Sequence, residues 1–333
     1  MALFDVVGKA MGVPAHCLLG KKVRDATPIS WWCSHSTPED WAAEAAAGVA
    51  AGYTSLKTKP RPWWDVIAQI EAVSDATPAH FRIDMDPNGT LDNAATAIPI
   101  LTRLSAYERV AMFETPIPQK DVLGNRQIRR AVPRPIAMHF GSPPFLTALR
   151  EEVCDGFVIN GGAHKVLQDG AQAAGAAMPF WLQLVGNGLT TTWAAHLGAV
   201  LSHATWPTIS CVNLYTDHLL ADPIRVQGGY QPVPNGPGLG VTVNEEAVAQ
   251  YRVADDKLAT VAEGQTYAHP TPRLINTIHY PDGSRVHVAQ LGTTSVHHGP
   301  GWSAGVHVVT REDDASADFA DLYNRVLQGP VRN

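Results

Sequence analysis

The chain has 333 residues, of which 45% are hydrophobic and 17% charged, as expected for a globular protein with one large domain and some additions. Its net charge of -6 argues against a nucleic-acid partner, which would require a basic surface. No apolar run approaches the roughly 20 residues that cross a bilayer, and we find no secretory leader. The four cysteines lack metal-binding or redox spacing. We therefore expect a cytoplasmic protein without a membrane partner.

From Pro28 to Asn213, short apolar segments alternate with longer Ala-rich stretches of helical periodicity. The apolar segments begin roughly 21 to 29 residues apart, the length of one strand–helix unit. They predict eight strands, at 29–34, 54–59, 81–86, 110–115, 135–140, 156–160, 180–185 and 208–213. Eight such units favour an α/β fold of the (β/α)8 TIM-barrel type, although the pattern alone does not exclude an open doubly wound sheet.

The periodic pattern ends after Asn213. Residues 214–263 are rich in Gly and Pro around 228–248, which predicts a segment that closes and covers the barrel and contains a short helix. Residues 264–333 predict a small β-containing appendage. Apolar and polar residues alternate there on both sides of Pro281-Asp282-Gly283, which indicates a hairpin, and 318–328 is typical of a terminal helix.

Polar side chains recur at or near the C-terminal ends of the predicted strands. In chain order they are Lys57, Lys59, Asp86, Glu114, His139, Asn160, Gln183 and Asn213. Strand-to-helix junctions are often polar, so any one of these residues has a purely structural explanation. Together they indicate the mouth of a barrel, which is where barrels of this type carry their chemistry.

Two of these groups suggest acid–base and metal chemistry. Lys57 and Lys59 face the same side of their strand, and two close ammonium groups lower each other's proton affinity, which favours a base at neutral pH. A lone KxK motif is also common at solvated strand ends. Asp86 and Glu114 end neighbouring strands, and a divalent cation, Mg²⁺ first, would remove the repulsion between their carboxylates.

The motifs resemble those of the mandelate racemase/muconate lactonizing branch of the enolase superfamily. SLKTK at 55–59 is similar to its KxK motif, IDMDPNG at 83–89 to its D-x-N motif and FETPIP at 113–118 to its E-x-P motif. Residues 232–251 resemble its closing PxGPGLG element, and residues 2–20 the segment that joins its capping domain to the barrel. The resemblance covers roughly residues 2 to 252.

This resemblance implies a mechanism with named roles. Lys59 would be the base that removes a proton α to a carboxylate, and Lys57 would bind that carboxylate or depress the pKa of Lys59. Asp86 and Glu114 would be metal ligands that help to stabilise an enediolate. Asp84 would support the site from one layer deeper, and Asn88 is a candidate substrate-binding residue.

Other positions depart from the family pattern. His139 stands where the family has its third, acidic metal ligand; it would either ligate the metal, which would then favour Mn²⁺ or another divalent cation over Mg²⁺, or only form hydrogen bonds. Asn160 and Gln183 replace the second acid–base group and cannot titrate. His35 is either a proton donor to a leaving group or a rim histidine. Asn160, Gln183, His35 and Asn213 remain candidate substrate-binding residues.

The resemblance also bears on organisation. Residues 1–27 correspond only to the end of the capping domain, so the sequence is either truncated or capped by another element, such as 264–333. Family members that form dimers or octamers imply a homo-oligomer. Our first hypothesis is a metal-dependent lyase, a dehydratase of a small hydroxy acid such as an acid sugar. The alternatives are a racemase, epimerase or cycloisomerase, and a catalytically impaired barrel that binds a carboxylate or serves as a structural protein.

Overall fold

The computed structural model describes residues 1–258, 272–292 and 301–333, and these form two compact units. The first unit comprises Met1–Arg61 and Val66–Val243, and the second comprises Pro62–Asp65 and Asn244–Asn333. The segment 214–263, predicted from sequence as one piece, is therefore divided at Val243. Its predicted end at 263 lies outside the described residues.

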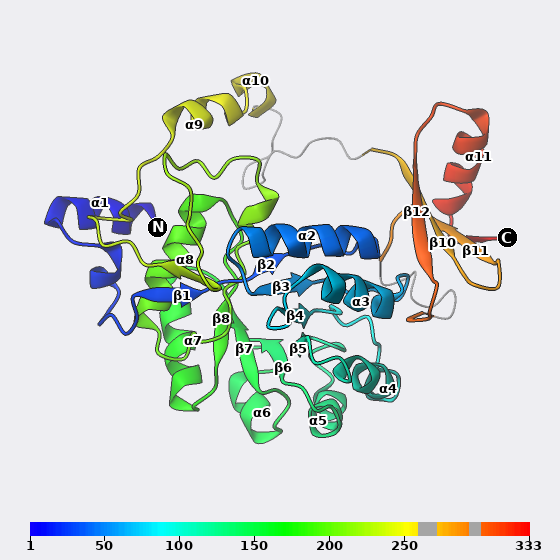
Figure 1. The fold of residues 1–333 in the computed structure, drawn as a ribbon, viewed down its shortest axis with the longest axis horizontal. Coiled ribbons are helices and arrows are strands. Elements are labelled where there is room, and N and C mark those ends of the chain that lie inside the picture. Colours follow the sequence, from blue (N-terminus) through cyan, green and yellow to red (C-terminus); the bar gives the residue numbers. More distant parts are fainter. Residues whose placement is uncertain (259–271, 293–300) are drawn as a thin grey trace. The chain divides into compact units, whose positions relative to one another are not determined.

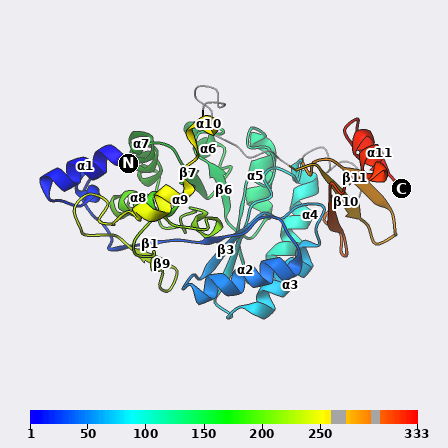
Figure 2. The same ribbon diagram turned by 90° about the horizontal axis from the view of Figure 1, so that it is seen from above.

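A parallel sheet of seven strands, in the order β2-β3-β4-β5-β6-β7-β8, forms the centre of the first unit. Each strand lies within one of the first seven predicted segments. Their bounds are β2 (Trp31–Trp32), β3 (Ser55–Thr58), β4 (Arg82–Met85), β5 (Val110–Glu114), β6 (Ile136–His139), β7 (Gly156–Ile159) and β8 (Phe180–Leu182). The strands curve around a common interior, as Figures 1 and 2 show from two directions.

The predicted eighth strand is present as two isolated bridges rather than as a regular strand. Thr208 pairs in parallel with Ile29, and Ile209 pairs in parallel with Gln183. The backbone of this segment thus reaches both edges of the sheet, and Ser30 N donates to Thr208 O at 3.0 Å. The chain then enters a 3-10 helix, η2 (Val212–Leu214). The predicted (β/α)8 barrel is thus confirmed, with a short bridging segment in place of a regular eighth strand.

Helices follow the strands in alternation and lie outside the curved sheet (Figure 1). They are α2 (Pro38–Ala50), α3 (Val66–Ala76), α4 (Ala94–Ser105), α5 (Val122–Ala131), α6 (Phe145–Arg150), α7 (Ala163–Gly175) and α8 (Gly188–Val200). The start of α2 agrees with its sequence: Thr37 caps it by accepting from Asp40 N, the Asp40 side chain accepts from Thr37 N, and Pro38 occupies the first turn.

One apolar cluster lies in the barrel interior. Side chains from successive strands meet there because every second residue of a strand points inward. They are Met112, Ala137, Val158, Trp181, Ile209 and Cys211, with the partly buried Trp32 and Trp206 packed against them. These side chains fill part of the space enclosed by the strands.

Short elements occupy the segments before and after the strand–helix repeats, where the sequence predicted a covering segment with one short helix. Strand β9 (Tyr230–Pro232) pairs antiparallel with β1 (Ala26–Pro28), so the stretch 228–248 contains a strand as well as the expected short helix, α9 (Glu245–Tyr251). Helix α1 (Ala2–Met11) and the 3-10 helix η1 (Ala15–Leu18) precede β1, and α10 (Asp255–Leu258) follows α9. No helix among the described residues is long and apolar enough to cross a membrane.

The second unit contains a four-stranded antiparallel sheet in the order β12-β10-β11-β13. Strands β10 (Leu274–His279) and β11 (Arg285–Val288) form a hairpin around the predicted turn, and β12 (His307–Glu312) and β13 (Val331–Arg332) pair outside them. Helix α11 (Ala317–Val326) covers Ile275 of the sheet through Phe319 and Val326.

A second cluster in this unit includes residues from far away in the sequence. Trp63 and Trp64 are 3% and 7% exposed and pack with Ile278, Val286 and Val306. Trp302 N donates to Pro62 O, and Asp65 N donates to Val306 O, both at 2.9 Å. The four residues that follow Arg61 are therefore part of the C-terminal unit.

Candidate functional site

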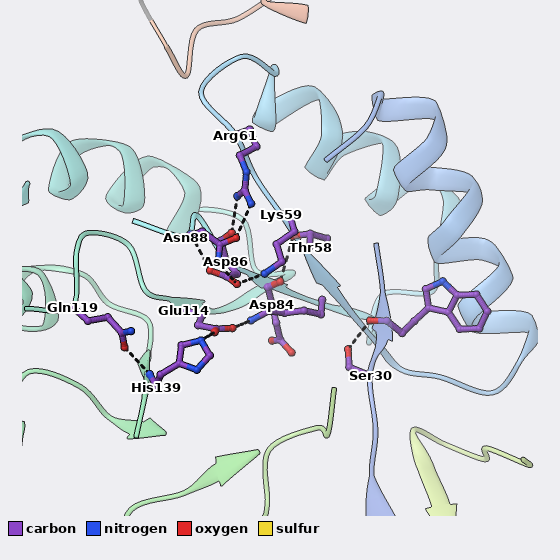
Figure 3. A network of polar contacts seen from close by, with 12 residues as sticks. Ser30, Thr58, Lys59, Arg61, Asp84, Asp86, Asn88, Glu114, Gln119 and His139 are labelled. Atoms are coloured by element: carbon purple, nitrogen blue, oxygen red, sulfur yellow. Dashed lines mark hydrogen bonds and ion pairs between the residues drawn. The ribbon is translucent and has the colours of Figure 1, made fainter. Parts of the chain in front are cut away.

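The ends of β3, β4, β5 and β6 bring the predicted acid–base and metal residues together at the barrel mouth (Figure 3). The register aligns Lys57 with Asp84, and Asp84 with Met112, in one layer. Lys59, Asp86 and Glu114 each lie two residues further along their strands, so they face the same side one layer nearer the mouth.

Lys57 lies in the deeper layer and is 1% exposed. Its ammonium pairs with Glu114 Oε2 and stands 4.5 Å above the centre of the Trp181 ring. Burial lowers the pKa of Lys57, but the carboxylates of Glu114 and Asp86 outweigh burial, and the net change is upward. For Lys57 the expected mutual depression by two ammonium groups is therefore wrong: a carboxylate partner and an aromatic face stabilise its charge.

Lys59 is nearer the mouth, with 18% of its side chain exposed, and pairs with Asp86 Oδ2. Asn88 binds the same carboxylate twice, through its backbone N to Oδ1 and its Nδ2 to Oδ2, both at 2.9 Å. Arg61 in turn donates to Asn88 Oδ1 at 2.6 Å. Figure 3 shows this continuous chain of contacts from Arg61 through Asn88 and Asp86 to Lys59.

Glu114 is fully buried and lies between Lys57 and His139. His139 Nε2 is 3.0 Å from Glu114 Oε1, and the His139 backbone N donates to Gln119 Oε1 at 2.7 Å. Burial raises the pKa of Glu114, but the cation of Lys57 and the His139 ring lower it more, to about 2. Glu114 is therefore an anion at every physiological pH.

The side chains at the mouth supply part of what a divalent cation needs. Within residues 1–258, 272–292 and 301–333, no three His, Cys, Asp or Glu side chains already surround one point. Two possible metal ligands nonetheless lie close together. Glu114 Oε1 is buried without a well-directed hydrogen bond, and His139 Nε2 lies 3.0 Å from it. Two ligands at about 2.1 Å and a right angle also stand about 3.0 Å apart. These residues fit a cation, provided that Asp86 gives up its ion pair with Lys59 and binds the cation instead.

Asp84 lies in the deeper layer with Lys57 and is 5% exposed. Burial raises the pKa of Asp84 to about 6; Lys57 opposes this rise and Glu114 adds to it. The folded chain thus holds the Asp84 proton more tightly than the unfolded chain, whose carboxyl titrates near 3.8. The free energy of unfolding should therefore fall as the pH rises from about 4 through about 6.

Asp84→Asn should remove this pH dependence, because the amide stays neutral. Because a shift of about two pKa units corresponds to roughly 3 kcal/mol, Asp84→Asn should be more stable than wild type by that amount at pH 8. At pH 5 the gain should be roughly half as large. Urea denaturation of wild type and variant at both pH values measures the difference, with Asp75→Asn on the exposed surface of α3 as the control. An equal effect of Asp84→Asn at pH 5 and pH 8 would contradict the burial of an ionisable group.

The opposite side of the mouth carries the predicted non-titrating residues. Asn160 is exposed at the end of β7, and Gln183 is half-buried just after β8. His35 is half-buried in the loop after β2, and burial together with the charge of Arg61 lowers its pKa. An imidazole of lowered pKa is neutral at pH 7, which favours the rim interpretation over the proton donor.

Asn213 has a different position from the one expected of a substrate-binding residue. Its Nδ2 donates to Trp32 O at 2.8 Å, and its Oδ1 accepts from Trp32 N at 3.3 Å. Both ends of the amide are thus used to hold the last barrel segment against β2. These contacts favour a role in closing the barrel over a role in binding substrate.

Three residues of the site were not predicted from the sequence. Arg61 and Trp181 each lie two residues from a predicted site residue, Lys59 and Gln183, so strand alternation was an available signal for both. No sequence pattern identifies Gln119, because its contact with the His139 backbone depends on the conformation of the loop between β5 and α5.

Comparison with known proteins gives the family of this barrel. The family model described as "Enolase C-terminal domain-like" matches residues 40–247, which is more than half of the chain. A solved mandelate racemase/muconate lactonizing family protein from Azoarcus sp. EbN1 is 28% identical, with a TM-score of 0.65 over 75% of this chain and 71% of that one.

Curated relatives include enzymes of several names. D-gluconate dehydratase of Thermoproteus tenax is 27% identical over 78% of this chain and 56% of its own length. A probable glucarate dehydratase of Streptomyces coelicolor is 30% identical over 75% of this chain and 63% of its own length. Others are named muconate cycloisomerase and N-succinylamino acid racemase. The chain thus spans less than two thirds of these two dehydratases. It belongs to the enolase C-terminal domain-like family, within the enolase superfamily.

Proposed function

We propose that this protein is a metal-dependent dehydratase that removes the proton α to the carboxylate of a small hydroxy acid of the acid-sugar class. One observation carries the proposal: Lys59 extends into the mouth beside Asp86, whereas the facing positions hold Asn160 and Gln183, which cannot exchange a proton. A site with one base suits elimination of water, and two of the relatives are named as dehydratases of D-gluconate and glucarate.

Each residue of the site would have its own role in the reaction. Lys59, released from Asp86 and having lost a proton, accepts the α proton and returns it to the β hydroxyl, which leaves as water. Asn88 orients the Asp86 carboxylate. Asp86, Glu114 and His139 would hold a divalent cation, either Mg²⁺ or, with the imidazole as ligand, Mn²⁺. When bound, the cation would offset the negative charge that develops on the substrate carboxylate as the α proton leaves. Lys57 holds Glu114 from below.

A cycloisomerase is the second candidate, because that reaction also needs only one proton-transferring group and relatives carry that name. A racemase or epimerase fits the site less well, since it would need a second titrating group opposite Lys59. The two candidates differ in substrate: a dehydratase acts on a hydroxy acid and releases water, whereas muconate is an unsaturated diacid.

The test is metal-dependent exchange of the α proton. Purified protein, stripped of metal, is incubated in D₂O with D-gluconate or D-glucarate and with Mg²⁺ or Mn²⁺, and the substrate is followed by NMR. We expect deuterium at the α carbon of the remaining substrate, together with a dehydrated product, only when metal is present. Asp86→Asn should weaken metal binding measured by calorimetry. If no metal binds and no acid sugar in a wider panel exchanges, the proposal is wrong.

A further inference from the structure

Arg61 is a cation at the barrel mouth without an anionic partner. It is half-buried, and its guanidinium donates from Nη1 to Pro60 O at 2.8 Å and to Asp86 O at 3.0 Å, and from Nη2 to Asn88 Oδ1 at 2.6 Å. All three acceptors are neutral. Within the described part of the chain, no carboxylate oxygen pairs with this guanidinium, in contrast to Arg126, Arg129 and Arg130 of α5.

The donor inventory of Arg61 leaves one part of the guanidinium available. Arginine has five N–H donors, and the three contacts use both donors of Nη1 and one of Nη2. The Nε–H and the second Nη2–H remain. These two donors belong to neighbouring nitrogens, and a carboxylate can accept from such a pair with both of its oxygens.

The charge of Arg61 is only partly compensated. Burial lowers the pKa of Arg61 more than the nearby charge of Asp86 raises it. A partly buried charge without a partner is unfavourable by itself, so such groups are frequent where a charged ligand supplies the missing partner. The charge of Arg61 also contributes to the lowered pKa of His35.

Lys57 cannot take the carboxylate-binding role that the family resemblance implies for it. It is 1% exposed, its ammonium is committed to Glu114, and the Trp181 ring covers another side of it. A substrate in the mouth would have to displace Glu114 to reach it. The nearest cation other than the base along this strand is Arg61, two residues after Lys59.

The four residues that follow Arg61 belong to the C-terminal unit. Pro62 O accepts from Trp302 N at 2.9 Å, and Asp65 Oδ2 accepts from Gly305 N at 2.7 Å, within the C-terminal unit. Trp63 and Trp64 are buried in the same unit. The guanidinium of Arg61 is held within the first unit, by its contacts with Pro60 O, Asp86 O and Asn88 Oδ1.

We propose that Arg61 binds the carboxylate of the substrate, in place of Lys57. This inference rests on the proposed function, because it takes the substrate to be a carboxylate. Arg61 would hold the carboxylate through the Nε–H and the remaining Nη2–H, and Asn88 and the Asp86 backbone hold the guanidinium in orientation. Lys59, two residues earlier, then stands beside the carbon that carries the proton to be removed.

The experiment pairs a variant with a change in the ligand. Binding of D-gluconate, D-glucarate and the neutral amide D-gluconamide is measured by calorimetry in the presence of Mn²⁺. Wild type should bind the acids roughly 10- to 100-fold more tightly than the amide, the range expected for a charge-assisted hydrogen-bonded pair. Arg61→Gln should lose most of this preference, and Arg61→Lys should recover part of it. A purely structural effect would weaken acid and amide alike.

The outcomes separate this assignment from the proposed function. Arg225→Gln, which removes an exposed arginine elsewhere in the first unit, should keep the full preference for the acid. If Arg61→Gln keeps that preference while wild type exchanges its α proton, Arg61 is not the carboxylate-binding residue and the proposed function survives. If the preference depends on Arg61 but no exchange occurs, the binding assignment holds and the dehydratase does not. If wild type prefers no acid, both proposals are overturned.

Discussion

Lys59→Ala should abolish incorporation of deuterium at the α carbon of a substrate that wild type exchanges. General bases contribute about 10²- to 10⁴-fold to the reactions that they catalyse, so the residual rate should fall to the background. The Lys59 side chain is 18% exposed and Lys57 is 1% exposed, so Lys57 cannot take over as base. Exchange in D₂O, followed by NMR with saturating Mn²⁺, measures the loss.

The control for this prediction is a lysine outside the site. Lys21→Ala removes an exposed ammonium before β1 and should leave exchange unchanged. Lys59→Ala also frees Asp86 from its ion pair, so the variant should bind Mn²⁺ at least as well as wild type. Exchange at the wild-type rate in a folded, metal-binding Lys59→Ala protein would refute the base assignment.

Lys57→Met should destabilise the barrel by about 3–5 kcal/mol, the usual result of removing one partner of a buried ion pair. Methionine fills much of the space of the lysine stem, so little of this loss would come from a cavity. The loss comes from the Glu114 carboxylate, which is 0% exposed and would remain as an unpaired buried charge. Urea denaturation at pH 8, monitored by tryptophan fluorescence, gives the free energy of unfolding.

The matched control removes both charges. In Lys57→Met/Glu114→Gln no buried carboxylate remains, so much of the stability should return. The loss in Lys57→Met alone should be smaller at pH 5 than at pH 8, because an unpaired Glu114 has a raised pKa and regains a proton on acidification. A single variant as stable as wild type at pH 8 would show that Lys57 and Glu114 are solvated rather than buried together.

Much of the barrel could be predicted from local patterns. Each of the first seven strands begins and ends within about two to three residues of its predicted segment, because apolar runs with polar ends are set by the sequence itself. The eighth segment was harder. Cys211 adopts a left-handed conformation with φ of 55°, so the run from Thr208 ends after two bridges, and no local pattern indicates this.

The positions of Lys57, Asp86 and Glu114 at the strand ends were also predictable, but their pairing was not. Strand alternation gives the face of each side chain, whereas ion pairing depends on the stagger between strands and on burial. The sequence suggested two lysines that repel, and the structure gives each its own carboxylate. The inclusion of Trp63 and Trp64 in the C-terminal unit was likewise hidden, since their partners lie more than 200 residues away.

Fully buried and half-exposed groups therefore divide the site into two parts. Lys57, Asp84 and Glu114 form a buried charged cluster that spans both layers, whereas Lys59, Asn88 and Arg61 are more exposed at the mouth. Motifs alone gave Lys57 and Lys59 similar weight, because a KxK pattern does not show which lysine reaches solvent. Burial decides between them and leaves Lys59 as the base.

The stereochemistry of α-proton exchange tests the one-base site most directly. Wild type is incubated with Mn²⁺ in D₂O together with an acid sugar that it accepts, and the recovered acid is analysed by NMR for deuterium content and for configuration at the α carbon. With Lys59 as the single base, deuterium should enter with retention and the epimer should not accumulate. Equal amounts of the two epimers, both deuterated, would require a second titrating group opposite Lys59 and would contradict the account.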